Sequence, residues 1–345
     1  MTRQRGRLLL GALLAVALLA WFFRGIDWGA LGGALRAARL LPLLGLVLVT
    51  VAVYSLRAWR WGDLLAPLGR VGYPDLFSAT MVGFASGLLV PRAGELLRPW
   101  LVSRRHPIPW SAGVATIILE RLVDMITVLV LFALYLFVLP APKAQVEGPA
   151  MELAKWFGIA GAALSLVALA FLLALHANAD RVVGALEKLL ARAPRWLAEP
   201  LGRMLHSFSA GLAVLRAPVP HLAKIALQSL AVWLLIALGF HLNHLAFRID
   251  LPFHATFLLI AFLVVGVAIP TPGMVGGFHA FYLLALSEAY GIDRATAAAA
   301  GIAAHALSNL PVLVFGLALL GREGLSLGRV AEVTRDEQKL QEVRS

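Results

Sequence analysis

The feature that most constrains this chain is a series of long segments with almost no charged residues. Such segments favour transmembrane helices, because the backbone polar groups of a span have no water to bond in the bilayer core. Six candidate spans are Leu8–Phe23, Leu40–Trp61, Ser111–Leu139, Trp156–Leu175, Leu222–Leu245 and Ala295–Leu320. The first span is short, because a transmembrane helix needs about 20 residues. The expected fold class is therefore all-α, a polytopic helical membrane bundle.

Composition agrees with a membrane location. Hydrophobic residues make up 60% of the 345 residues and charged residues 14%, whereas about 25% of residues are charged in an average soluble protein. The absence of cysteine excludes disulfides, thiolate metal sites and cysteine nucleophiles. The net charge of +11 is interpreted through its distribution across a bilayer, so we expect no nucleic-acid partner. No residue spacing indicates a metal site or a cofactor.

Two further apolar stretches, Leu76–Ser103 and Ala255–Tyr290, are interrupted by prolines and glycines. The limbs of the second stretch, Ala255–Ile269 and Gly277–Tyr290, would each be roughly 21–23 Å long, too short for a hydrocarbon core of about 30 Å. We interpret both stretches as re-entrant helical hairpins, whose exposed backbone must be buried in protein or line a wet cavity. The residues assigned to the two hairpin tips are Pro91, Gly94, Pro270, Pro272, Gly273, Gly276, Gly277 and His279.

The distribution of lysine and arginine predicts the orientation of the chain. If both hairpins return to their own side, segments 1–7, 57–110, 176–224 and 321–345 share one side and hold 22 basic residues, against 7 on the other side. The positive-inside rule then places both termini in the cytoplasm. We expect a multi-pass protein of a bacterial inner (plasma) membrane, with residues 321–345 as a cytoplasmic tail.

The predicted elements also repeat along the chain. Residues 1–150 and 151–320 each contain three spans, with a hairpin placed before the last span. Three is an odd number, so the two halves have opposite orientations in the membrane, as in inverted-repeat transporters. We therefore treat residues 1–320 as a single transmembrane domain made of two halves.

Three ionisable residues lie close together in the span that follows the first hairpin. Glu120, Arg121 and Asp124 fall within a 100° arc of one helix face, and Glu120 lies roughly 13 Å along the helix from Ser111. Charges at such depth are rare, and they usually face the interior of the bundle and mark a site or a pathway.

The first hairpin tip carries a complementary set of charges. Two arginines and a glutamate sum to +1 there, and the helix set sums to −1, so the two sets together form a nearly neutral network. Such a network could fasten the hairpin to the bundle, or its guanidinium groups could bind a phosphate bidentately. The predicted substrate-binding residues are Arg92, Glu95, Arg98, Glu120, Arg121 and Asp124.

Three sequence blocks, PRAGELLRPWLVSRR, ILERLVD and IPTPGMVGGFHA, resemble in that order the motifs of the lysylphosphatidylglycerol synthase transmembrane-region family. The resemblance covers about Leu40 to Leu320. It implies a helical membrane domain with re-entrant segments, and movement of lipids between leaflets. The third block departs from the family, because Met274 stands where a second glycine is common and His279 where a glutamate is common. The soluble synthase domain of the best-understood members does not follow the spans, so aminoacyl transfer is not expected.

These observations lead to one main functional hypothesis and two alternatives. The main hypothesis is a flippase-like transporter of the bilayer that moves an anionic phospholipid or a polyprenyl-phosphate-linked lipid. Under this hypothesis the protein is not an enzyme, and no G-x-x-x-x-G-K-[ST] motif indicates nucleotide hydrolysis. One alternative is a non-catalytic membrane subunit for a separate glycosyltransferase or lipid synthase. The other is an intramembrane enzyme that uses Glu120 or Asp124 as a general base.

Overall fold

The computed structural model describes residues 2–89, 93–139, 212–269 and 271–322, together with scattered positions between 156 and 188. The described residues form helices and connecting turns, and they contain no strand. The helices are α1 Thr2–Phe23, α2 Trp28–Ala37, α3 Leu40–Leu65, α4 Tyr73–Leu89, α5 Ala93–Ser103, α6 Trp110–Phe137, α9 Val219–Ala246, α10 Ala255–Ala268, α11 Gly277–Leu283 and α12 Arg294–Arg322. Two 3₁₀ turns, η1 Leu212–Arg216 and η2 Pro272–Met274, and a π-helical turn, η3 Leu284–Ala289, complete the set.

Several sequence predictions fall on residues that the structure does not describe. They concern most of the fourth predicted span, Trp156–Leu175, the tail from residue 323 onward, and the tip residues Pro91, Arg92 and Pro270.

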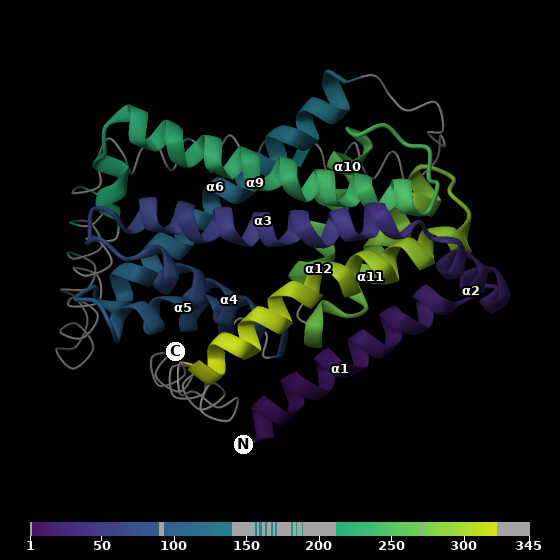
Figure 1. Ribbon diagram of the computed structural model, residues 1–345, viewed down its shortest axis with the longest axis horizontal. Coiled ribbons are helices and arrows are strands. Elements are labelled where there is room, and N and C mark those ends of the chain that lie inside the picture. Colours follow the sequence, from purple (N-terminus) through teal and green to yellow (C-terminus); the bar gives the residue numbers. More distant parts are fainter. Residues whose placement is uncertain are drawn as a thin grey trace.

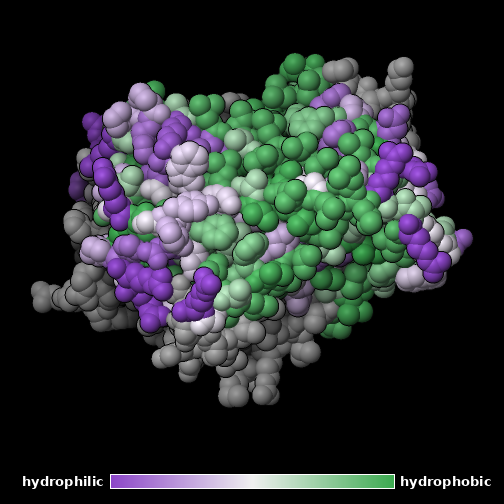
Figure 2. Space-filling view, viewed as in Figure 1, coloured by the Kyte–Doolittle hydropathy of each residue, from purple (hydrophilic) through white to green (hydrophobic). Residues whose placement is uncertain are grey.

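Three helices, α3, α9 and α12, are long and apolar enough to cross a membrane. The pair α1 and α2 adds a fourth candidate if it forms one broken span, bent by 87° between the two helices. Helix α6 is 28 residues long but carries three ionisable residues near its middle. Figure 2 shows a belt of hydrophobic residues across the centre of the molecule, with hydrophilic residues gathered at both ends. The described helices thus confirm an all-α membrane fold with three or four candidate spans. They do not establish the expected six spans, nor that the two interrupted stretches are re-entrant in a membrane.

Each of the two interrupted stretches folds as a pair of packed helices joined at a close glycine contact. A Cβ atom on Gly94 would lie 2.2 Å from the carbonyl oxygen of Gly83, and one on Gly277 would lie 2.2 Å from that of Gly266. In both pairs the glycines are eleven residues apart in the sequence, since 94 − 83 and 277 − 266 are equal. Only glycine permits backbones to approach so closely. The helix ends Ala268 and Ser103 lie within one residue of the predicted limb ends.

The order of elements also repeats: α3, α4, α5 and α6 are matched by α9, α10, α11 and α12. In Figure 1, α3 and α9 lie side by side and run in opposite directions. Helices α6 and α12 also run in opposite directions but are not neighbours. The contacts between elements follow the same pattern, because α12 packs on α4 and α6 packs on α10. The tip turn η2 of the second hairpin contacts α4 of the first. The two hairpins therefore meet inside the bundle.

One sequence interpretation is wrong for the end of α3. We expected this span to end at Trp61, with residues 57–110 forming a cytoplasmic segment. The helix instead continues to Leu65, and the side chains of Arg57 and Arg60 are buried in the bundle, with 6% and 0% of their surface exposed. Two arginines counted as loop charges thus belong to the interior, where carboxylates on α6 compensate them.

A charged network beside a cavity

The first hairpin is bound to α6 by a buried bidentate ion pair. The Nη1 and Nη2 atoms of Arg98 donate to Oε1 and Oε2 of Glu120 at 3.0 and 3.2 Å. The Arg98 guanidinium also lies over the Trp61 ring, 4.5 Å from its centroid. Both charged side chains are almost completely buried. This geometry satisfies both charges and holds α5 at a fixed position against α6.

A second buried ion pair joins α3 to α6. The Arg60 guanidinium donates to both oxygens of Asp124, at 2.5 and 3.2 Å, and it also bonds Ser229 on α9. Arg57 reaches the same carboxylate at 3.4 Å, and the indole N–H of Trp233 donates to it at 3.1 Å. Asp124 therefore connects three long helices, α3, α6 and α9.

Sequence reasoning missed Arg57 and Arg60, although a signal was present. The two arginines are three residues apart, so they share a face of a helix. This face continues an apolar span, and arginines within a span are usually paired with carboxylates on a neighbouring helix. The carboxylates Glu120 and Asp124 had been identified, and their partners on α3 could have been searched for on that basis.

The predicted site residues are only partly brought together. Arg98, Glu120, Arg121 and Asp124 form one cluster, in which Arg121 bonds Glu120 and lies 3.5 Å from Asp124. Glu95 is exposed, although it lies near enough for its charge to act on Arg121. Arg92 lies outside the described residues.

The charges of the described cluster do not cancel. Its members are four guanidinium groups and two carboxylates, which leaves a net charge of +2. Arg60 and Arg98 each have a bidentate carboxylate partner. The positive excess therefore falls on Arg57, whose carboxylate contact is the longer one, and on Arg121, whose side chain is 39% exposed.

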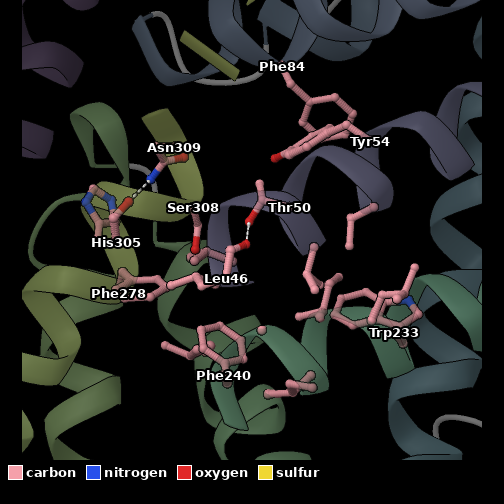
Figure 3. A pocket seen from close by; sticks show the side chains of 18 of the residues that line it. Leu46, Thr50, Tyr54, Phe84, Trp233, Phe240, Phe278, His305, Ser308 and Asn309 are labelled. Atoms are coloured by element: carbon pink, nitrogen blue, oxygen red, sulfur yellow. Dashed lines mark hydrogen bonds between the residues drawn. The ribbon is translucent and has the colours of Figure 1, made fainter. Parts of the chain in front are cut away.

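Arg57 and Arg121 border a cavity of about 270 Å³ between the two halves of the bundle. Most of its wall is apolar, with contributions from α3, α4, α9, α10 and α12. Figure 3 shows Trp233 at one end and His305, Ser308 and Asn309 toward the other. An amphiphilic ligand fits such a lining, because apolar walls accept chains and a few polar groups orient a head group.

In the second hairpin tip, the predicted residue His279 packs against other rings and takes no part in the charged network. His279 is 7% exposed, and its ring lies 4.8 Å from that of His305 and 5.3 Å from that of Phe22. It does not line the cavity, so it packs the tip against α1 and α12. Gly273 and Met274 both adopt positive φ, at 62° and 58°, so the glycine-rich turn continues through a residue that tolerates this conformation less well.

The described residues contain no group of three histidine, aspartate or glutamate side chains that could hold a metal ion. The ionisable groups of the cluster are instead arranged as arginine–carboxylate pairs. Such a set suits an anion better than a cation, because its net charge is positive and its free donors are N–H groups.

Comparison with known proteins adds to this geometry. The chain is 24% identical over 357 aligned residues to a protein named glycosyltransferase AglD from Haloferax volcanii. The alignment covers 95% of this chain but 56% of that relative, so the chain spans little more than half of its length. The model of the lysylphosphatidylglycerol synthase transmembrane region matches residues 8–316. The chain therefore belongs to this family of integral membrane proteins.

Proposed function

We propose that the protein moves a phosphate-bearing, anionic lipid between the leaflets of a membrane. The observation that carries the proposal is the cavity, which joins a surplus of positive charge at Arg57 and Arg121 to a long apolar wall. A lipid phosphate would sit at the two guanidinium groups, and its chains would follow the apolar surface or remain in the bilayer. Guanidinium groups bind phosphate oxygens through paired N–H donors and remain charged.

In this proposal four of the six predicted binding residues take different roles. Arg98 and Glu120 hold the first hairpin, because their bidentate pair leaves neither group available to a ligand. Arg60 holds Asp124 in the same way. Arg121 remains in the lipid site and Arg57 joins it.

Movement between leaflets would use the two halves of the chain. The repeated order of elements and the opposite directions of α3 and α9 support an inverted repeat of residues 1–150 and 151–320. In such transporters the substrate site lies near the membrane midplane, and the halves rock against each other around it. The lining of the cavity supports such a position, because α3 and α9 both line it near their middles and η2 contributes Met274.

The orientation in the membrane, with cytoplasmic termini in a bacterial plasma membrane, can be tested by labelling. The chain has no cysteine, so single cysteines can be placed freely. Arg104→Cys marks the open end of the first hairpin, and Glu288→Cys marks that of the second, and both side chains are exposed. An impermeant maleimide should label Arg104→Cys only from the cytoplasmic side and Glu288→Cys only from the outside. Labelling of both from one side contradicts the inverted arrangement.

The transport test uses purified protein in liposomes. Exchange of a labelled phosphatidylglycerol between leaflets is compared for the wild type, Arg57→Lys, Arg57→Ala, Arg121→Ala and the control Arg36→Ala. Arg36 is an exposed arginine on α2 and does not line the cavity. We expect Arg57→Ala to slow exchange at least tenfold and Arg57→Lys nearly as much, because lysine lacks the planar fork. An unchanged rate in folded Arg57→Ala and Arg121→Ala would overturn the proposal.

A second candidate is a membrane unit that presents a lipid-linked substrate to a glycosyltransferase. It is favoured by the alignment of nearly the whole chain with part of a protein named as a glycosyltransferase. Co-purification of a transferase and product formation by the pair, without lipid exchange by this chain alone, would support it. An intramembrane general base fits the geometry less well, because arginines already occupy the oxygens of Glu120 and Asp124.

A further inference from the structure

The cavity has a second polar end, and its chemistry differs from that of the arginine end. Thr50 on α3 and three residues of α12, His305, Ser308 and Asn309, line the cavity there. Ser308 and Asn309 lie three and four positions after His305, which places both on the same face of the helix as His305. Figure 3 shows Thr50 and Ser308 on facing helices within this part of the cavity.

The hydrogen atoms of these groups are largely in use. The Thr50 hydroxyl donates to the Leu46 carbonyl oxygen at 2.9 Å, and the Ser308 hydroxyl donates to that of Ala304 at 2.6 Å. A hydroxyl has a single hydrogen and two acceptor lone pairs. Both oxygens can therefore accept a hydrogen bond from a ligand, but they have no hydrogen left to donate.

The two remaining side chains extend the same pattern. His305 Nε2 lies 3.0 Å from the carbonyl oxygen of Gly273, so Nε2 carries the hydrogen and Nδ1 of the neutral ring is an acceptor. The Asn309 amide donates one of its hydrogens to the His305 carbonyl oxygen at 2.8 Å. Its own carbonyl oxygen stays available as an acceptor. This end thus offers four acceptors and one N–H donor.

Such a set disfavours a phosphate and fits a hydroxyl-bearing group. An ionised phosphodiester has only acceptors, so it could bond only the single N–H donor of this end. A polyol or a sugar supplies O–H donors and fits well. Thr50 and Arg57 are seven residues apart, which is roughly 10 Å along α3. A ligand that reaches both ends must therefore extend well beyond its phosphate.

We infer that the lipid carries a polyhydroxylated head group on its phosphate, which Thr50, Ser308 and Asn309 recognise through its hydroxyl hydrogens. This inference rests on the proposed function, and it names the substrate class of the same cavity. The shared chemistry is a glycosyl or polyol phosphate. It can be carried by a glycerolipid or by a polyprenyl chain.

The experiment measures leaflet exchange in liposomes for matched pairs of lipids. One pair is phosphatidic acid and phosphatidylinositol, and the other is a polyprenyl phosphate and its hexosyl ester. In the wild type we expect the hydroxylated member of at least one pair to exchange at least fivefold faster, and the pair that shows this identifies the lipid carrier. Equal rates within both pairs would overturn the inference.

Variants then assign the preference to the second polar end. Asn309→Leu and the milder Ser308→Ala and Thr50→Val should slow the exchange of the hydroxylated lipid, so that the ratio of the two exchange rates in the responsive pair falls toward one. The exchange rate of the lipid that lacks the hydroxylated head group should change little. Ser55→Ala is the control, because Ser55 lies on α3 but does not line the cavity. An unchanged ratio in all three folded variants overturns the inference. Failure of the proposed function is a separate result, because the Arg57 variants would then slow none of the lipids.

Discussion

The two hairpins of the molecule share a backbone design but differ in what holds their tips. In each hairpin a glycine of the first limb packs closely against a glycine eleven residues later, and a Cβ atom on the first glycine would also meet a side chain fifteen residues later. That side chain is Arg98 in the first hairpin and Phe281 in the second. The glycine contact therefore sets the geometry of a hairpin, and the residue beyond it decides whether charge or apolar packing fixes the hairpin to the bundle.

The same contrast continues into the cavity. Arg121 lies eleven residues beyond the start of α6 at Trp110, and His305 lies eleven residues beyond the start of α12 at Arg294. Both residues line the cavity, from helices that run in opposite directions. Residues 1–150 thus supply the cationic end, and α12 supplies the neutral end together with Thr50 of α3.

The largest effect is expected when the glycine contacts are removed. Gly94→Ala and Gly277→Ala each place a Cβ atom 2.2 Å from a backbone oxygen, which no side-chain movement can relieve. Each change should cost more than about 3 kcal/mol, at or above the upper end of the usual range for overpacking, and both proteins should fail to yield a monodisperse fold. The control is Gly33→Ala on α2, where nothing lies within 4 Å. If only one of the two hairpin variants loses its fold, the hairpins do not share this design.

The next largest effect concerns the residue beyond the glycines. Arg98→Ala leaves the buried Glu120 without its bidentate partner, which should cost about 3–5 kcal/mol of unfolding free energy. The double variant Arg98→Leu with Glu120→Leu makes the first hairpin apolar like the second, and it should recover most of this loss. Thermal unfolding in detergent measures both variants.

The double variant also separates structure from function. Under the proposed function it retains lipid exchange, because Arg57 and Arg121 remain. A folded double variant without exchange would place the Arg98–Glu120 pair in the lipid site. Phe281→Ala is the matching change in the second hairpin. It should cost less than Arg98→Ala, because it leaves no unpaired charge.

The sequence allowed the hairpins and the α6 cluster to be predicted for local reasons. Proline and glycine interrupt apolar runs at fixed positions, and three charges at helical spacing must share one face of α6. The role of Arg57 was not predictable in the same way. Its burial depends on a bond to Asp124, which lies 67 residues later in the chain. The positive-inside rule counts every arginine near the end of a span as a loop charge, and it takes no account of a carboxylate partner on another helix. Helix α2, Trp28–Ala37, was also missed, because it lies between the first two predicted spans, although Asp27 is a local signal for its start.

A smaller effect is expected from the neutral bonds that hold the second hairpin. The Asn243 amide on α9 donates to the Tyr282 hydroxyl at 2.8 Å and to the Ala300 carbonyl oxygen at 2.9 Å. Asn243→Leu should cost roughly 1–3 kcal/mol, because it leaves these buried groups without a partner. Tyr282→Phe removes only one bond and should cost less. If Asn243→Leu were as damaging as Arg98→Ala, the two hairpins would not differ in the strength of their attachment.

The smallest effect is expected at the open end of the first hairpin, where Asp75 accepts bonds from Arg105 at 2.7 Å and from His106 at 3.0 Å. Partial burial alone would raise the pKa of Asp75, but the bonds from His106 and Arg105 outweigh it and lower this pKa. The folded-state pKa thus lies below the unfolded value, so the stabilisation is present at neutral pH and is lost as the pH falls through the folded pKa. Asp75→Asn should lower stability by less than about 1 kcal/mol at neutral pH, because the pair is exposed and screened. The difference in unfolding free energy between this variant and the wild type, measured by thermal unfolding, should shrink as the pH is lowered. A difference that grows toward low pH would show that the carboxylate destabilises this end of the hairpin.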